Sequence, residues 1–216
     1  GSRAIADLQL AFNTTYTLRI SGNAIGQNGG VLAPPLVLTF TTRQEGSGGS
    51  ACTSGTTACL ASLAIDGQGR LPVYNSFPVV EDTTTWDNLR AAVIVVHGAN
   101  RNAGDYFEYL MYSLQEEALE GEVLLLAPHF QEETTTGNTL FWSGNSWREG
   151  QRSGGNNPVS SFAVVDELIR KLANPERFPV MEKVIITGHS SGGLFTHLFA
   201  AANQSEPAYS DLDFEY

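Results

Sequence analysis

Three largely apolar runs alternate with helical segments in the second half of the chain, and this order constrains the fold more than any other feature. The runs are Ala91–Val96, Val123–Ala127 and Val184–Thr187. A strand that is apolar on both faces is typical of a buried parallel sheet. Strand and helix in alternation therefore predict an α/β fold, with a mostly parallel sheet, right-handed crossovers and helices on both faces.

The helices expected between these runs are set by apolar spacing and by end signals. Asp105–Leu119 carries apolar residues at helical spacing and ends before Gly121. Pro158–Leu172 begins with Asn157 as the cap and proline in the first helical position. A third helix is expected over Gly193–Ala202, and a short strand begins near Leu212.

Residues 9–43 predict β structure of a different kind. Thr14–Ile20 and Leu36–Thr42 alternate apolar and polar residues and are rich in β-formers. With Gly29-Gly30 and Leu32-Ala33 between them, these strands resemble the last two strands of a bacterial Ig-like domain of exported and surface proteins. The alternative is a hairpin that belongs to the following domain. The Ig-like interpretation gives three parts: residues 1–43, a linker at 44–60, and the α/β domain at 61–216.

The linker contains the only two cysteines of the chain, Cys52 and Cys59, among Ser, Gly, Thr and Ala. A structural zinc site needs four ligands, so this pair does not predict one, and no metal or cofactor is expected elsewhere. A small disulfide loop is the preferred interpretation, with two free thiols as the alternative. The disulfide would place the protein in an oxidising compartment: outside the cell, on its surface or in the periplasm.

The charge balance excludes several classes of partner. Twelve basic against 23 acidic residues give a formal net charge of −11 over 216 residues. No basic stripe is available to neutralise phosphates, which argues against nucleic acid. No run approaches the ~20 apolar residues of a membrane helix. The sequence leaves the oligomeric state undetermined.

The strongest chemical signal is the hexapeptide Gly188-His189-Ser190-Ser191-Gly192-Gly193. It follows the third apolar run and opens the third helix, so it is a G-x-S-x-G motif in strand–turn–helix context. Such a turn lifts the Ser190 hydroxyl above the sheet edge, and Gly188 and Gly192 allow strand and helix to approach. The alternative is a glycine-rich turn without chemistry.

A second turn, His97-Gly98-Ala99-Asn100, follows the first apolar run. It resembles the oxyanion loop of the α/β-hydrolase family. By that resemblance, the backbone amides of Ala99 and Ser191 would hold the oxyanion, and Gly98 would permit the turn. His97 is expected to orient the loop by a hydrogen bond rather than to act as the general base.

Residues from about 70 to 216 resemble the N-terminal two-thirds of an α/β-hydrolase. The family resemblance implies a serine hydrolase with the triad order serine, acid, histidine. After Ser190 only His197 remains, two turns into the third helix, too far from the serine for a base. Asp211 is kept open as the acid. We therefore expect a fragment that lacks the triad histidine, and an acid beyond Tyr216 is preferred to Asp211.

The long connection from Gln131 to Asn157 carries Phe141, Trp142 and Trp147 among polar residues. Insertions over this sheet edge form substrate walls or lids. The alternative is a surface loop whose aromatic side chains fasten it to the body.

Together these features predict an exported serine hydrolase, similar to carboxylesterases and lipases, joined to an Ig-like module. It would cleave a small-molecule or polymeric ester through an acyl-enzyme on Ser190; an amide is the second choice. The alternative function is a catalytically silent hydrolase fold that serves as a binding module of a surface or adhesion protein.

Overall fold

The computed structural model describes residues 14–20, 36–41, 50–65, 68–80, 83–133, 137–155 and 157–216. The chain divides into two compact units, Gly1–Glu45 and Gly46–Tyr216. The division falls close to the boundary expected from the change in sequence pattern at residue 43.

The first unit contains two antiparallel strands, β1 (Thr15–Ile20) and β2 (Leu36–Thr41). Both strands are those expected from the alternating pattern. Leu18 stands opposite Leu38, and both side chains are about half exposed, at 50% and 48%. Gly29, Gly30, Leu32 and Ala33, which support the Ig-like resemblance, lie outside the described residues.

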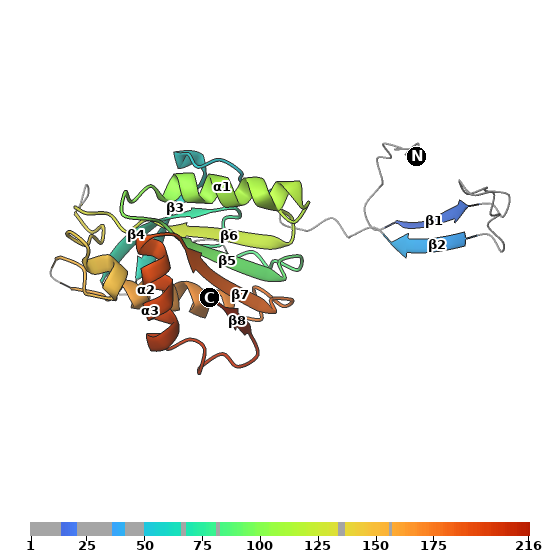
Figure 1. Cartoon of the computed structure of the whole chain (residues 1–216). Helices are drawn as coiled ribbons and strands as arrows, with labels where there is room; N and C mark the ends of the chain where they lie inside the picture. Colours follow the sequence, from blue (N-terminus) through green and yellow to red (C-terminus); the bar gives the residue numbers. More distant parts are fainter. Residues whose placement is uncertain are drawn as a thin grey trace. The chain divides into compact units, whose positions relative to one another are not determined.

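The second unit is built on a six-stranded sheet with the order β3-β4-β6-β5-β7-β8. Its strands are β3 (Leu60–Ile65), β4 (Gly69–Asn75), β5 (Ala91–Val96), β6 (Val123–Pro128), β7 (Lys183–Gly188) and β8 (Asp213–Glu215). β6, β5, β7 and β8 run parallel, whereas β3 and β4 add an antiparallel hairpin at one side. The predicted α/β class is confirmed (Figure 1).

Three helices cover the sheet: α1 (Ala103–Glu116), α2 (Ser161–Leu172) and α3 (Ser191–Ala202). α1 lies on one face, and α2 and α3 lie on the other (Figure 1). Two buried clusters reflect these two faces. Leu125 and Ala127 of β6 join Phe107 and Met111 of α1, while Leu124 and Leu126 join the larger cluster. Successive side chains of β6 are thus buried on opposite faces, which explains its continuous apolar sequence.

α2 begins three residues later than its sequence predicts. Ser160 is the N-cap, and its Oγ accepts a hydrogen bond from the amide of Phe162 at 3.1 Å. Ser160 also forms a bridge with Arg152, which holds this residue in extended geometry. The helix therefore begins after Ser160, which caps it and pairs with Arg152, and not at Pro158 after Asn157 as the sequence predicts.

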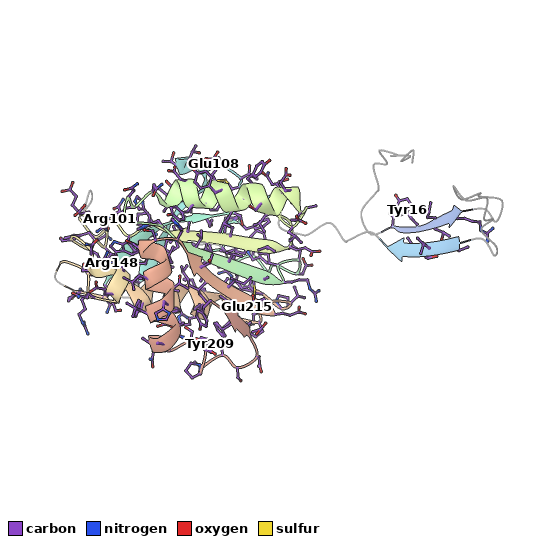
Figure 2. The ribbon with its side chains drawn as sticks, in the orientation of Figure 1. Tyr16, Arg101, Glu108, Arg148, Tyr209 and Glu215 are labelled. Atoms are coloured by element: carbon purple, nitrogen blue, oxygen red, sulfur yellow. A yellow bond between two sulfur atoms is a disulfide. The ribbon has the colours of Figure 1, made fainter. Side chains whose placement is uncertain are left out.

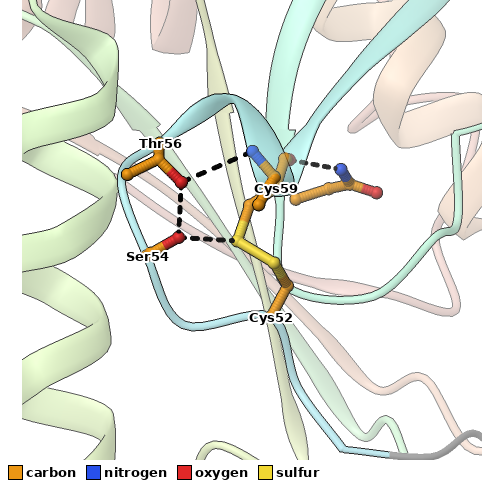
Figure 3. The surroundings of a disulfide bond; sticks show 6 residues. Cys52, Ser54, Thr56 and Cys59 are labelled. Carbon is orange, nitrogen blue, oxygen red and sulfur yellow. Dashed lines mark hydrogen bonds between the residues drawn. A yellow bond between two sulfur atoms is a disulfide. The ribbon is translucent and has the colours of Figure 1, made fainter.

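The predicted disulfide is present between Cys52 and Cys59 (Figure 3). Its loop ends in a short 3₁₀ helix, η1 (Thr57–Cys59), and packs on the body of the unit instead of forming part of a linker. The amide of Cys52 donates to the carbonyl of Ser76 at 2.6 Å, and Asn75 Nδ2 donates to the carbonyl of Cys59 at 2.8 Å. These bonds tie the loop to the end of β4.

Removing this crosslink is expected to lower stability. The Cys52→Ser/Cys59→Ser variant should lose about 2.5 kcal/mol of unfolding free energy, because the bond closes a short loop in the unfolded chain. Urea unfolding monitored by tryptophan fluorescence measures the loss. The reduced wild-type protein serves as the control and should match the variant. Unchanged urea midpoints for both would contradict the prediction.

No helix in the described part of the chain is long and apolar enough to cross a membrane.

Candidate active site

Ser190 stands in a strained turn between β7 and α3. Its backbone has φ 58° and ψ −118°, and it is one of three residues other than glycine that have positive φ in the described part of the chain. The residue is exposed. Strain of this kind costs free energy and persists only when the surroundings impose it. The strand–turn–helix context expected of a nucleophile elbow is therefore present at Ser190.

Gly188 and Gly192 explain how the turn is imposed. A Cβ on Gly192 would lie 2.1 Å from the carbonyl oxygen of Val96 and 2.7 Å from that of His97. A Cβ on Gly188 would lie 2.6 Å from the carbonyl carbon of Gly192. The strand, the turn and the first turn of the helix therefore contact one another through backbone atoms, which only glycine permits at these two positions.

The start of α3 presents free amides beside Ser190. The amide of Gly192 donates to the carbonyl of His189, and that of Leu194 donates to the carbonyl of Ser190. The amide of Ser191, the first residue of the helix, donates to no acceptor among the described residues. Free amides and the helix dipole make such a terminus favourable for negative charge.

The turn after β5 lies against this elbow. β5 and β7 are neighbouring parallel strands, with Val96 opposite Gly188, so both turns leave the same edge of the sheet. The amide of Arg101 donates to the carbonyl of Gly98 at 3.1 Å and closes the turn. Ala99 is exposed within it, and its amide has no acceptor among the described residues. The candidate oxyanion donors thus come from two turns in contact.

His97 is fully buried and fixed by two hydrogen bonds. The amide of Phe130 donates to Nε2 at 3.1 Å, so the proton is on Nδ1, which donates to the carbonyl of Gly98 at 2.9 Å. Desolvation lowers the pKa of His97 to about 3. A neutral imidazole with both nitrogens occupied positions the loop, as the sequence analysis expects.

This buried histidine should make the second unit acid-sensitive. Between a pKa of about 3 in the folded state and 6.5 in the unfolded chain, only the unfolded chain binds the proton. Stability should therefore fall as pH decreases below 6.5, by about 1.4 kcal/mol per pH unit for this residue. Urea unfolding of wild type and His97→Gln between pH 4.5 and 6 measures the difference in slope.

The glutamine variant keeps an acceptor for the Phe130 amide but has no proton to gain. Desolvation also lowers the pKa of His129, and that contribution remains in both proteins, so it cancels in the comparison. Equal slopes in the two proteins would show that His97 does not carry the acid sensitivity.

Arg101 is a residue that the sequence analysis misses. Its backbone has φ 55°, and its guanidinium donates to the carbonyls of Phe130 at 2.6 Å and Trp142 at 2.8 Å, and to that of Gly144. The same group lies 5.9 Å from the ring centre of Trp147. Arg101, labelled in Figure 2, therefore fastens the turn after β5 to the long connection after β6. No local pattern marks it.

The aromatic residues of the long connection are mainly anchors. Trp142 and Trp147 are fully buried, which removes both from a substrate-facing surface and corrects the interpretation of these two side chains as part of a substrate wall. The Trp147 ring lies 4.5 Å from that of His97 and stacks on Phe195 of α3. Phe141 is only half-buried. The connection thus supports the turn that carries Ala99.

Asp211 and Asp213 lie near the end of the sheet opposite to the elbow. β8 runs parallel to β7 with Asp213 opposite Lys183, and the two side chains form an ion pair at 3.0 Å. Ser190 follows the other end of β7, and a strand of six residues spans about 16 Å. Asp211, two residues before β8, is therefore too far from Ser190 to be the triad acid. The hypothesis that Asp211 serves as this acid is wrong.

Among the described residues, no side chain hydrogen-bonds to Ser190 Oγ. His189 and His197 are both exposed. No cluster of three or more histidine, cysteine, aspartate or glutamate side chains suited to a metal occurs in the same part of the chain.

Comparison with known proteins gives two structural resemblances. No protein-family model matches the chain, and no curated protein matches it. Poly(aspartic acid) hydrolase-1 from Sphingomonas sp. KT-1 is 22% identical with a TM-score of 0.41, over 65% of this chain and 50% of that one. A thermostable esterase is 17% identical with a TM-score of 0.40, over 92% and 48%. The chain spans about half the length of each, and the likeness concerns the fold alone.

Proposed function

We propose that this chain carries the nucleophile and the oxyanion site of an exported serine hydrolase, similar to carboxylesterases and lipases. The observation that supports the proposal most is the backbone of Ser190: an exposed serine at φ 58° and ψ −118°, at the start of a helix. Strain at an exposed polar residue between two glycines that the packing requires is typical of a functional site.

In the proposed reaction, Ser190 Oγ attacks the carbonyl carbon of an ester. A bond forms between them while the hydroxyl proton passes to a general base, and the carbonyl electron pair moves to the oxygen. The amides of Ala99 and Ser191 stabilise this oxyanion by hydrogen bonds. When the intermediate collapses, the alcohol leaves with a proton and the acyl group remains on Ser190. Water then releases the acid in a second, equivalent step.

The disulfide and the N-terminal unit support the proposed location. A bond between Cys52 and Cys59 favours an oxidising compartment, so we place the protein outside the cell or at its surface. The first unit would serve there as an Ig-like spacer or attachment module.

A fluorophosphonate probe on the full protein tests the proposal. We expect a single covalent label, which peptide mass spectrometry assigns to Ser190, and no label in Ser190→Ala. The probe requires a nucleophilic serine and an oxyanion site but no particular acyl group, so it does not depend on knowing the substrate. If the folded, full-length protein takes no label, a catalytically silent binding module becomes the better explanation.

A further inference from the structure

The hydroxyl of Tyr106 lies against the turn that carries the proposed oxyanion donor. A Cβ on Gly98 would lie 2.7 Å from Tyr106 Oη and 3.7 Å from the carbonyl oxygen of His189. The phenol and the serine elbow therefore border the same space beside Gly98. A side chain at position 98 would meet this hydroxyl, which occupies the volume that its Cβ would need.

Tyr106 is held in this place by a rigid element. It lies in the first turn of α1, and its amide donates to the carbonyl of Asn102 at 3.4 Å. Its ring is partly buried against the cluster that contains Ala103 and Phe107. A residue fixed on a helix can hold a hydrogen-bond donor in position more closely than a loop can.

The hydroxyl itself has no hydrogen-bond partner among the described residues. A phenol can donate one hydrogen bond, and this one is next to a turn whose exposed amide, at Ala99, also lacks an acceptor in the described part. Two donors without acceptors at one edge of the sheet are suited to an incoming negative charge.

We propose that the Tyr106 hydroxyl is a third hydrogen-bond donor to the oxyanion formed when Ser190 is acylated. This inference rests on the proposed function. The phenol keeps its proton throughout, and it donates to the substrate oxygen as that oxygen gains charge. A hydrogen bond to an oxyanion is stronger than one to a neutral carbonyl. The contribution should therefore appear in the transition state, and hence in kcat more than in KM.

Tyr106→Phe tests this role because it removes one oxygen and keeps the ring. We expect kcat/KM for p-nitrophenyl acetate to fall about 100-fold, mostly in kcat, as for other oxyanion donors. The second-order rate constant for fluorophosphonate inactivation should fall with it, since the phosphonyl oxygen occupies the same site. Tyr109→Phe is the matched control: it lies on the same helix, 69% exposed, and should leave both constants unchanged.

A loss smaller than about tenfold in Tyr106→Phe would overturn the inference. If wild type shows activity that Ser190→Ala lacks while Tyr106→Phe equals wild type, only this inference fails. If the folded, full-length wild-type protein neither hydrolyses the ester nor takes the probe, the proposed function fails as well. The two failures are therefore distinguishable when wild type is measured beside Ser190→Ala, Tyr106→Phe and Tyr109→Phe.

A second measurement tests the placement of the hydroxyl without any assay of activity. Gly98→Ala should destabilise wild type, because the new Cβ meets Tyr106 Oη at 2.7 Å. In the Tyr106→Phe background that contact is absent, and the ring carbon Cζ lies at 3.6 Å, an ordinary contact. We expect the loss in unfolding free energy to be smaller there. Equal losses in both backgrounds would place the hydroxyl elsewhere and overturn the inference.

Discussion

Ser190→Ala is expected to lower kcat/KM for ester hydrolysis by about 10³-fold or more. The substitution removes the oxygen that forms the covalent intermediate but leaves the amides of Ala99 and Ser191 in place, so a weak residual rate should persist. Stability should change little, because Ser190 is exposed and its Oγ makes no hydrogen bond among the described residues. Initial rates with p-nitrophenyl acetate and thermal unfolding of the same samples measure the two effects.

The neighbouring serine provides the control. Ser191 is almost completely buried, and its proposed contribution is a main-chain amide, which alanine retains. Ser191→Ala should therefore keep activity within about threefold of wild type. If activity survives in Ser190→Ala and disappears in Ser191→Ala, the nucleophile is Ser191 and the assignment to Ser190 is wrong.

The parts of this fold that the sequence predicts are those governed by local physics. A strand buried on both faces needs a continuous apolar run, and Ala91–Val96 is found with the bounds expected. The G-x-S-x-G motif of the elbow is local in sequence, although one contact that excludes a side chain at Gly192 is with Val96, at the end of the neighbouring strand β5. The role of His97 in orienting the loop is also predictable, because this residue comes directly after a buried strand.

The antiparallel hairpin of β3 and β4 has a weaker signal. Pro72 lies within β4, and proline is typical of edges rather than of strand interiors. It is tolerated because β6 pairs only with Val73, Tyr74 and Asn75. Beside Pro72, the strand presents its carbonyl oxygen, which accepts from the amide of His129. This arrangement depends on a partner strand more than fifty residues away, so no local pattern reveals it.

The anchoring of the long connection is non-local in the same way. Trp142 and Trp147 stand in a polar segment without periodicity, so the sequence shows aromatic residues but not whether they face solvent. The connection is held in place by partners far away in the sequence: the Arg101 guanidinium donates to backbone carbonyls at positions 130, 142 and 144. A guanidinium that donates to backbone carbonyls far away in the sequence follows no spacing pattern, so Arg101 could not be singled out from the sequence.

The second large effect is expected on stability, from a substitution at Gly192 in the first turn of α3. Gly192→Ala should lower the unfolding free energy by about 3 kcal/mol or more, at or above the usual cost of overpacking. Its Cβ would stand 2.1 Å from the carbonyl oxygen of Val96. The obstacle is backbone at the end of a central strand, which cannot rotate away as a flexible side chain could. The gain in helix propensity, at most about 1 kcal/mol, does not compensate.

Gly193→Ala is the matched control because it makes the same chemical change one residue further along. Its Cβ would be 3.4 Å from the nearest atom, the carbonyl oxygen of Gly188, so helix propensity should prevail and raise stability by up to about 1 kcal/mol. Thermal and urea unfolding of the two variants should therefore differ in sign relative to wild type. Because the displaced backbone would be the contact between the elbow and the His97 turn, Gly192→Ala should also slow fluorophosphonate labelling, whereas Gly193→Ala should not. Equal stability of the two variants would show that the elbow and the His97 turn do not meet through backbone atoms. The amides of Ala99 and Ser191 would then not face one oxyanion.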